Sequence, residues 1–155
     1  MVDTAEKASQ AVIDMKEAGY DYVKVYSFLT EECYDAIIDT AKEIGIKVIG
    51  HISYNLSTEY IVESGQILIA HSEEVMKHAN GDYSEENIDY LAGIITNSDT
   101  WIIPTLVTTR NFISTFDNLE EKLKASEIKY LHPMAAGAWT FINNMAYLSM
   151  PEEVR

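Results

Sequence analysis

The spacing of hydrophobic residues alternates between two patterns along the first two thirds of the chain, and this alternation predicts repeating helix–strand units. Segments with apolar side chains every three to four residues are followed by short apolar runs at 22–26, 46–52, 67–71 and 101–107. Strands that alternate with helices in this way are typical of parallel α/β sheets and barrels. We therefore expect four parallel strands, with helices between them.

Helix start and stop signals agree with this division. Each predicted helix begins after a hydroxyl residue that can cap its N-terminus, at Thr4, Thr30, Ser57 and Ser84. Glycines end three of these helices, at Gly19, Gly45 and Gly65. Pro104 interrupts the fourth strand and predicts that strand pairing ends there, as at the rim of a barrel.

Three strands each carry an ionisable side chain, Lys24, His51 and His71. A lone lysine in a strand more often points into solvent, and a lone histidine is more often structural. Two histidines at the ends of consecutive strands change this balance, because the carboxyl ends of parallel strands meet at one rim. The pattern predicts a site there, and Gly50 permits a close backbone approach just before His51.

Other residues are assigned to structure rather than chemistry. Cys33 lies on the apolar face of its predicted helix and is expected in the core, and His78 is expected on the surface of a polar loop. After residue 108 the alternation is lost. Leu119–Ile128 is compatible with a helix, and Trp139–Leu148 is an aromatic segment that either covers the barrel or lines a pocket, two alternatives that stay open.

Composition narrows the classes of function. The 155 residues, 47% of them hydrophobic, predict a single domain over 1–155, divided into a β/α half-barrel segment at 1–107 and a helical region at 108–155. A net charge of −14 argues against a nucleic-acid partner. The single cysteine precludes an internal disulfide. No apolar run suggests a signal peptide or a membrane span, so we expect a cytoplasmic protein without a membrane partner.

Five segments together resemble the amidohydrolase superfamily, in particular its imidazolonepropionase and metal-dependent prolidase-like branch. They are Gly19–Tyr26, Leu29–Glu32, Val48–His51, Ile69–Glu74 and Pro104–Leu106. The resemblance implies a binuclear divalent metal centre, expected to hold zinc, in which a carboxylated Lys24 bridges the metals and His51 and His71 are ligands. It also implies hydrolysis of C–N bonds in small amide, peptide-like or cyclic amide substrates by metal-activated water.

The resemblance is incomplete. The family also uses a His-x-His pair on strand one and an aspartate after strand eight, whereas the units here resemble strands four to seven of a (β/α)8 TIM barrel. We therefore expect a partial barrel with an incomplete metal centre, inactive by itself and without an identified catalytic base.

A non-catalytic alternative is a half-barrel assembly module that pairs through its open sheet edges as a homo-oligomer. In that arrangement a second copy would cover an apolar interior face formed by Ile49, Ile67 and Ile69. A barrel enzyme of another chemistry is less favoured, because no Gly-rich phosphate loop is present.

Overall fold

The computed structural model describes residues 2–111, 121, 123–135 and 137. Internal contacts divide the chain into two compact units, Met1–Pro104 and Thr105–Arg155. The boundary lies three residues before the one expected from the sequence, at the proline that ends the last strand. Each unit is described by itself.

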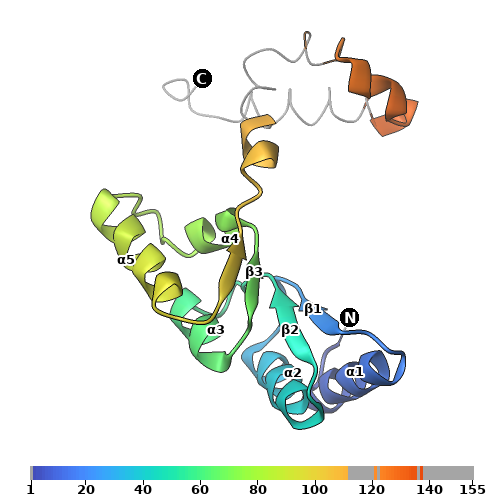
Figure 1. The fold of residues 1–155 in the computed structure, drawn as a ribbon, viewed down its shortest axis with the longest axis vertical. Coiled ribbons are helices and arrows are strands. Elements are labelled where there is room, and N and C mark those ends of the chain that lie inside the picture. Colours follow the sequence, from blue (N-terminus) through green and yellow to red (C-terminus); the bar gives the residue numbers. More distant parts are fainter. Residues whose placement is uncertain (1, 112–120, 122, 136, 138–155) are drawn as a thin grey trace. The chain divides into compact units, whose positions relative to one another are not determined.

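The first unit is a mixed α/β fold with four parallel strands in one sheet (Figure 1). Its elements, in chain order, are α1 (Ala5–Glu17), β1 (Tyr22–Val25), α2 (Glu31–Ile44), β2 (Lys47–Gly50), α3 (Thr58–Ser64), β3 (Leu68–Ala70), α4 (Ser72–Lys77), α5 (Glu85–Thr96) and β4 (Trp101–Ile103). The strands pair in the order β1-β2-β3-β4. The predicted partial α/β barrel with about four β/α units is confirmed.

The predicted capping residues begin their helices as expected. The hydroxyl oxygen of each accepts a hydrogen bond from a backbone N–H in the first turn, at Thr4, Thr30, Ser57 and Ser84. Gly45 and Gly65 end α2 and α3 in the left-handed conformation that favours glycine. Helix α1 ends slightly earlier than predicted, because its C-cap is Ala18.

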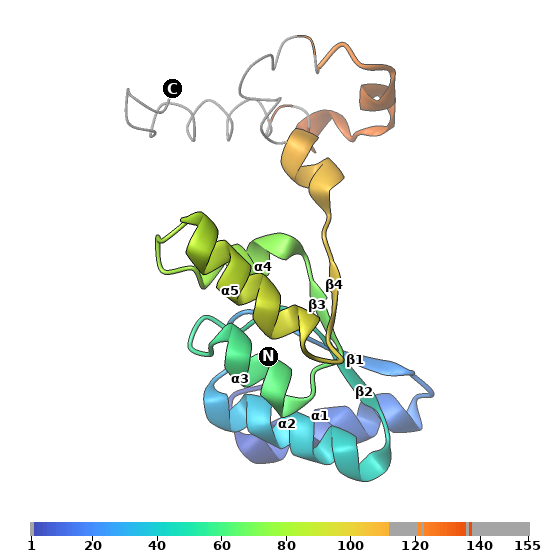
Figure 2. The ribbon, with the colours of Figure 1, turned by 60° about the vertical axis from the view of Figure 1, so that its left-hand side comes forward.

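Helices pack on one face of the sheet and form the core there (Figure 2). Val25, Val48 and Ile69 contribute the sheet side of this core and are buried with helix residues such as Ile37 and Ile61. Burial of such side chains is the main favourable term in folding. The predicted core position of Cys33 is confirmed, since it is buried in the same cluster.

The opposite face of the sheet carries Lys24, Ile49, Leu68 and Trp101, which are aligned by the strand register and are called here the lysine face. The prediction that Ile69 shares a face with Ile49 is wrong. Ile49 pairs with Leu68, and Ile69 is fully buried on the helix-covered face. Because side chains alternate along a strand, the one-residue difference in register moves Ile67 and Ile69 together to the other face.

In the second unit, residues 106–111 are helical and a 3-10 helix spans Ser126–Tyr130. The helix predicted over Leu119–Ile128 lies partly outside the described residues, and its described end is a turn followed by that 3-10 helix. The aromatic segment Trp139–Leu148 lies wholly outside them. No helix in the described part of the chain has the length and hydropathy to cross a membrane.

Gly50 is the position where the sheet tolerates no side chain. Its φ is +134°, and a Cβ atom added there would lie 2.2 Å from the carbonyl oxygen of Val25. We expect Gly50→Ala to lower the free energy of unfolding by roughly 3 kcal/mol or more, measured by urea denaturation, because backbone atoms of β1 would have to move.

The matched control is Gly93→Ala within α5, where an added Cβ meets no atom within 4 Å. This change should raise the free energy of unfolding by about 0.5–1 kcal/mol, because alanine favours the helix over the unfolded chain. Equal unfolding midpoints for the two variants would contradict the predicted close approach at Gly50.

Candidate functional site

The structure brings the three predicted site residues to neighbouring positions at the carboxyl ends of the first three strands. Lys24 is exposed in β1, His51 follows β2 directly and His71 follows β3 directly. The ring centroids of His51 and His71 are 5.2 Å apart. Tyr26 links the lysine to this pair: its ring lies 4.0 Å from that of His51, and the Lys24 ammonium lies 5.9 Å from its centroid.

His51 is buried and held from one side of its ring. Its Nδ1 lies 3.1 Å from the hydroxyl oxygen of Ser27, whereas its Nε2 is buried and has no hydrogen-bond partner among the described residues. Burial lowers the pKa of His51, and the nearby carboxylate of Glu74 opposes this shift only in part. The ring is therefore neutral near pH 7, and neutral imidazole is the form that binds metals.

Glu74 is a buried acid that sequence reasoning missed. It is 1% exposed, and its Oε2 accepts a hydrogen bond from the backbone N–H of Ile52 at 3.2 Å. Its Oε1 lies 3.7 Å from Nδ1 of His51 and also accepts a hydrogen bond from the ammonium of Lys77. This carboxylate therefore joins helix α4, the end of β2 and the candidate site.

The sequence carries a partial signal for Glu74. Ser72 followed by two glutamates is typical of a first helical turn, and the structure forms α4 at this point, where a polar loop was expected. Nothing in that short pattern distinguishes Glu73, which is exposed, from Glu74, which is buried. The direction in which α4 leaves the sheet decides which glutamate faces inward.

His71 lies at the turn from β3 into α4. Its φ of +88° is unusual for a residue other than glycine, and its backbone N–H donates to the carbonyl oxygen of Ile103 at 2.9 Å. Strained backbone of this kind persists where the surrounding structure fixes it, and it is concentrated at functional sites. Hydrogen bonding to β4 thus fixes the backbone that carries the second imidazole.

The prediction that His78 lies on the surface is wrong. It is the C-cap residue of α4 and is half-buried, and its Nε2 is enclosed. Burial lowers the pKa of His78. Its burial follows from the formation of α4, which turns the expected loop into a packed element beside α5.

The described residues include no group of three histidine, cysteine or acidic side chains placed to hold a metal. What they offer is a pair of adjacent imidazoles, one with a buried unpaired nitrogen, and the amine of Lys24 nearby. Catalytic zinc usually has three protein ligands. The set therefore fits part of a metal centre, and the role of Lys24, His51 and His71 as metal ligands stays a prediction.

Comparison with known proteins supports the fold at a distant level. No protein-family model and no curated protein matches the sequence. Among solved structures, the bottromycin amidohydrolase aligns with a TM-score of 0.64 at 18% identity, over 99% of this chain and 35% of that chain. A crystal structure of an uncharacterized protein aligns with a TM-score of 0.51 at 19% identity, over 76% of this chain and 29% of that chain.

The chain thus spans about a third of the length of these solved structures. At such low identity the likeness concerns the fold alone.

The buried position of Glu74 leads to a prediction about stability. We expect Glu74→Ala to lower the free energy of unfolding by roughly 2–4 kcal/mol, because the buried N–H of Ile52 loses its acceptor and Lys77 loses its partner. Chemical denaturation monitored by circular dichroism would measure this. Glu73→Ala removes the exposed neighbour and should cost less than about 1 kcal/mol. Similar losses in the two variants would show that Glu74 is not the buried member of the pair.

Proposed function

We propose that this chain contributes the Lys24, His51 and His71 side of a metal-dependent hydrolytic site that cleaves C–N bonds in small amide, peptide-like or cyclic amide substrates. One observation carries the proposal: two imidazoles lie 5.2 Å apart at the ends of adjacent parallel strands. One of them, that of His51, has a buried nitrogen without a hydrogen-bond partner in the part of the chain that the structure describes. The carboxyl ends of parallel strands are where barrel enzymes hold their chemistry.

The residues around His51 are suited to holding a ligand in place. Ser27 and Glu74 lie on the Nδ1 side of the ring, and the ring of Tyr26 lies 4.0 Å away, so the imidazole is held in one orientation. Supporting contacts of this kind orient metal ligands in known sites. When bound, a divalent ion such as zinc supplies polarisation of a carbonyl group and activation of water near neutral pH.

Lys24 contributes a solvent-accessible amine. The residue is exposed on the lysine face, so its amine is accessible to dissolved CO2 as well as to water. Carboxylation would convert this cation into an anionic oxygen donor, which suits a hard divalent metal better than an ammonium group does. We propose that Lys24 is used in this form and adds an oxygen donor to the two imidazoles when the metal centre is assembled.

Metal binding tests the proposal. We expect the purified chain to bind zinc or cobalt weakly, because two imidazoles are fewer than the three ligands usual for catalytic zinc. His51→Asn and His71→Asn should each weaken binding about tenfold or more, measured by calorimetry and by the visible absorption of the cobalt-loaded protein.

His132→Asn is the matched control, because His132 is exposed and belongs to the second unit. It should leave metal affinity unchanged. A tightly held metal that survives dialysis in both the His51→Asn and the His71→Asn variants would place the ligands elsewhere, and a chain that binds neither metal would refute the site.

A second candidate function is assembly through the sheet, favoured by the exposed aromatic residues of the lysine face and of its neighbours. Trp101 is 75% exposed, and Tyr22, two residues before Lys24 on the same strand, is also exposed. Within the described residues, β1 and β4 are the outer strands of the sheet. Outer strands and exposed apolar faces favour pairing with another chain. We propose a second copy of this chain as the partner.

Sedimentation equilibrium tests this assembly. We expect a dimer at micromolar concentration, and we expect Trp101→Lys to shift it toward monomer by placing a charge on the paired face. Tyr83→Lys, at an exposed residue between α4 and α5, should not change the association constant. A monomeric wild-type chain with no exposed apolar surface by dye binding would rule the dimer out.

A further inference from the structure

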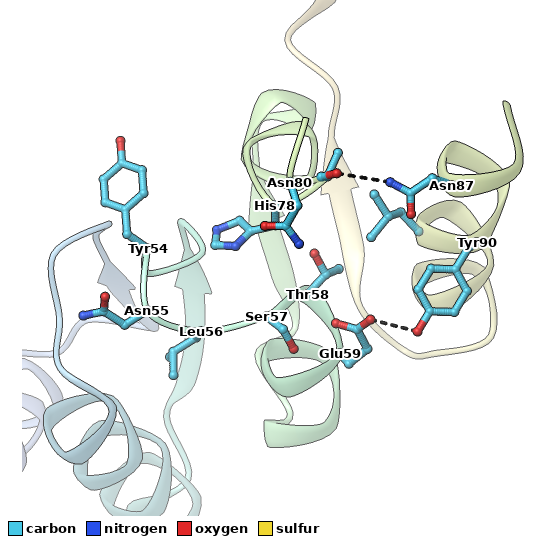
Figure 3. A pocket seen from close by; sticks show the side chains of 12 residues that line it. Tyr54, Asn55, Leu56, Ser57, Thr58, Glu59, His78, Asn80, Asn87 and Tyr90 are labelled. Atoms are coloured by element: carbon cyan, nitrogen blue, oxygen red, sulfur yellow. Dashed lines mark hydrogen bonds between the residues drawn. The ribbon is translucent and has the colours of Figure 1, made fainter. Parts of the chain in front are cut away.

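The first unit contains a cavity of about 410 Å³, lined by residues other than the candidate metal ligands, that we call the polar pocket. Three parts of the first unit form it: the loop from β2 into α3, the end of α4 with the turn that follows, and the first half of α5 (Figure 3). Its volume lies within the range of small-molecule sites. Its lining is mainly polar, in contrast to the apolar helix-covered core.

Thr58 gives the first indication that this pocket binds a ligand. The residue is 1% exposed, and its hydroxyl oxygen has no hydrogen-bond partner among the described residues. The helix does not need this hydroxyl, because the neighbouring Ser57 already caps α3 by accepting from the N–H of Tyr60 at 3.2 Å. A buried hydroxyl without a partner is costly, so a role outside the helix accounts for it.

His78 gives a second, independent indication from the facing element. Its Nε2 is also buried without a hydrogen-bond partner among the described residues, and the residue lines the same pocket from the end of α4 (Figure 3). Burial lowers the pKa of His78, so its ring is neutral near pH 7. In the neutral ring this nitrogen donates or accepts according to the tautomer.

The walls of the pocket are fixed in place by hydrogen bonds. The Asn87 amide donates to the carbonyl oxygens of Ala79 and Asp82 at 3.3 and 2.7 Å, which holds the turn after α4 against α5. The hydroxyl of Tyr90 donates to the carboxylate of Glu59 at 2.9 Å and joins α5 to α3. A rigid pocket binds a small molecule without a large loss of conformational entropy.

The charge of the pocket lining disfavours anionic ligands. The residues that line the pocket include Glu59 but no lysine or arginine, and hydrogen bonds at the start of α3 lower the pKa of that glutamate, so it stays ionised. The net charge of the chain is −14. An anion would meet the carboxylate of Glu59. The ammonium of Lys77, which lies 5.9 Å from the ring of Tyr54, is already paired with Glu74, so anionic ligands are disfavoured.

The two atoms without a hydrogen-bond partner among the described residues, Thr58 Oγ1 and His78 Nε2, narrow the class of ligand further. Thr58 presents a hydroxyl, which both donates and accepts, and His78 presents a nitrogen that does one or the other. A ligand hydroxyl also does both, so it satisfies Thr58 and either tautomer of His78. An ammonium group only donates, so it satisfies Thr58 but not the tautomer of His78 that carries a proton on Nε2. Tyr54 and Tyr90 add aromatic surface to the polar lining.

We propose that the polar pocket binds a neutral polyhydroxylated molecule of about monosaccharide size, with ligand hydroxyls bonded to Thr58 Oγ1 and His78 Nε2. This site is separate from the hydrolytic function proposed above. It requires neither a metal nor Lys24, His51 or His71, so either proposal can fail without the other.

Nuclear magnetic resonance titration of the whole chain tests the proposal, with D-glucose and myo-inositol as probes. We expect at least one of them to shift the backbone amide signals of Thr58, Glu59, His78 and Asn80 in a saturable way. Sodium sulfate and tetramethylammonium chloride are the anionic and cationic comparison probes, and neither should produce saturable shifts there. Saturation by either ion and not by the polyols would overturn the proposed ligand class, and no saturable shift with any probe would overturn the site.

Two variants then assign the binding to the unpaired atoms. Thr58→Val keeps the shape of the side chain and removes only a hydroxyl that has no hydrogen-bond partner among the described residues. It should weaken polyol binding about two- to tenfold, the effect of one neutral hydrogen bond. His78→Leu should weaken binding similarly and serves if Thr58→Val does not fold. Thr96→Val, on α5 outside the pocket, is the control and should bind like the wild type. Unchanged affinity in both pocket variants would refute the assignment.

Discussion

The parallel register between the first two strands is the constraint on which the rest of the first unit depends. Val25 pairs with Gly50, and the N–H of His51 donates to the carbonyl oxygen of Val25 at 3.1 Å. This contact requires the backbones to approach at Gly50 more closely than any side chain permits. It fixes where β2 ends, and therefore where His51 leaves the sheet beside Tyr26. The candidate site is thus a consequence of how two backbones meet.

The buried carboxylate of Glu74 holds α4 against the ends of the strands. A charged group is rarely stable inside a protein unless it is paired and hydrogen-bonded. Glu74 satisfies this condition through the N–H of Ile52 and the ammonium of Lys77, with His51 nearby. Because these partners come from the end of β2 and from α4 itself, the carboxylate positions the helix and limits the space open to the imidazole.

The sequence predicted those features that depend on local chemistry. Capping hydroxyls, glycine stops and strand periodicity each act within a few residues, so the helix starts, the four strands and the core position of Cys33 could be inferred. The face assigned to Ile69 could not, because strand register depends on pairing between distant segments. The burial of Glu74 and His78 could not be predicted for a related reason. Both depend on the direction of a short helix, which no sequence pattern in α4 specifies.

Helix α4 connects the candidate metal ligands to the polar pocket. Its first turn follows His71, its middle carries Glu74, and its C-cap is His78. Burial lowers the pKa of both His51 and His78, and the carboxylate of Glu74 opposes this lowering in each. In both residues the effect of burial is larger than that of Glu74. Both imidazoles therefore stay neutral beside one buried acid, which suits one of them to bind a metal and the other to bind a ligand hydroxyl. Residues at the two ends of α4 thus belong to the two candidate sites.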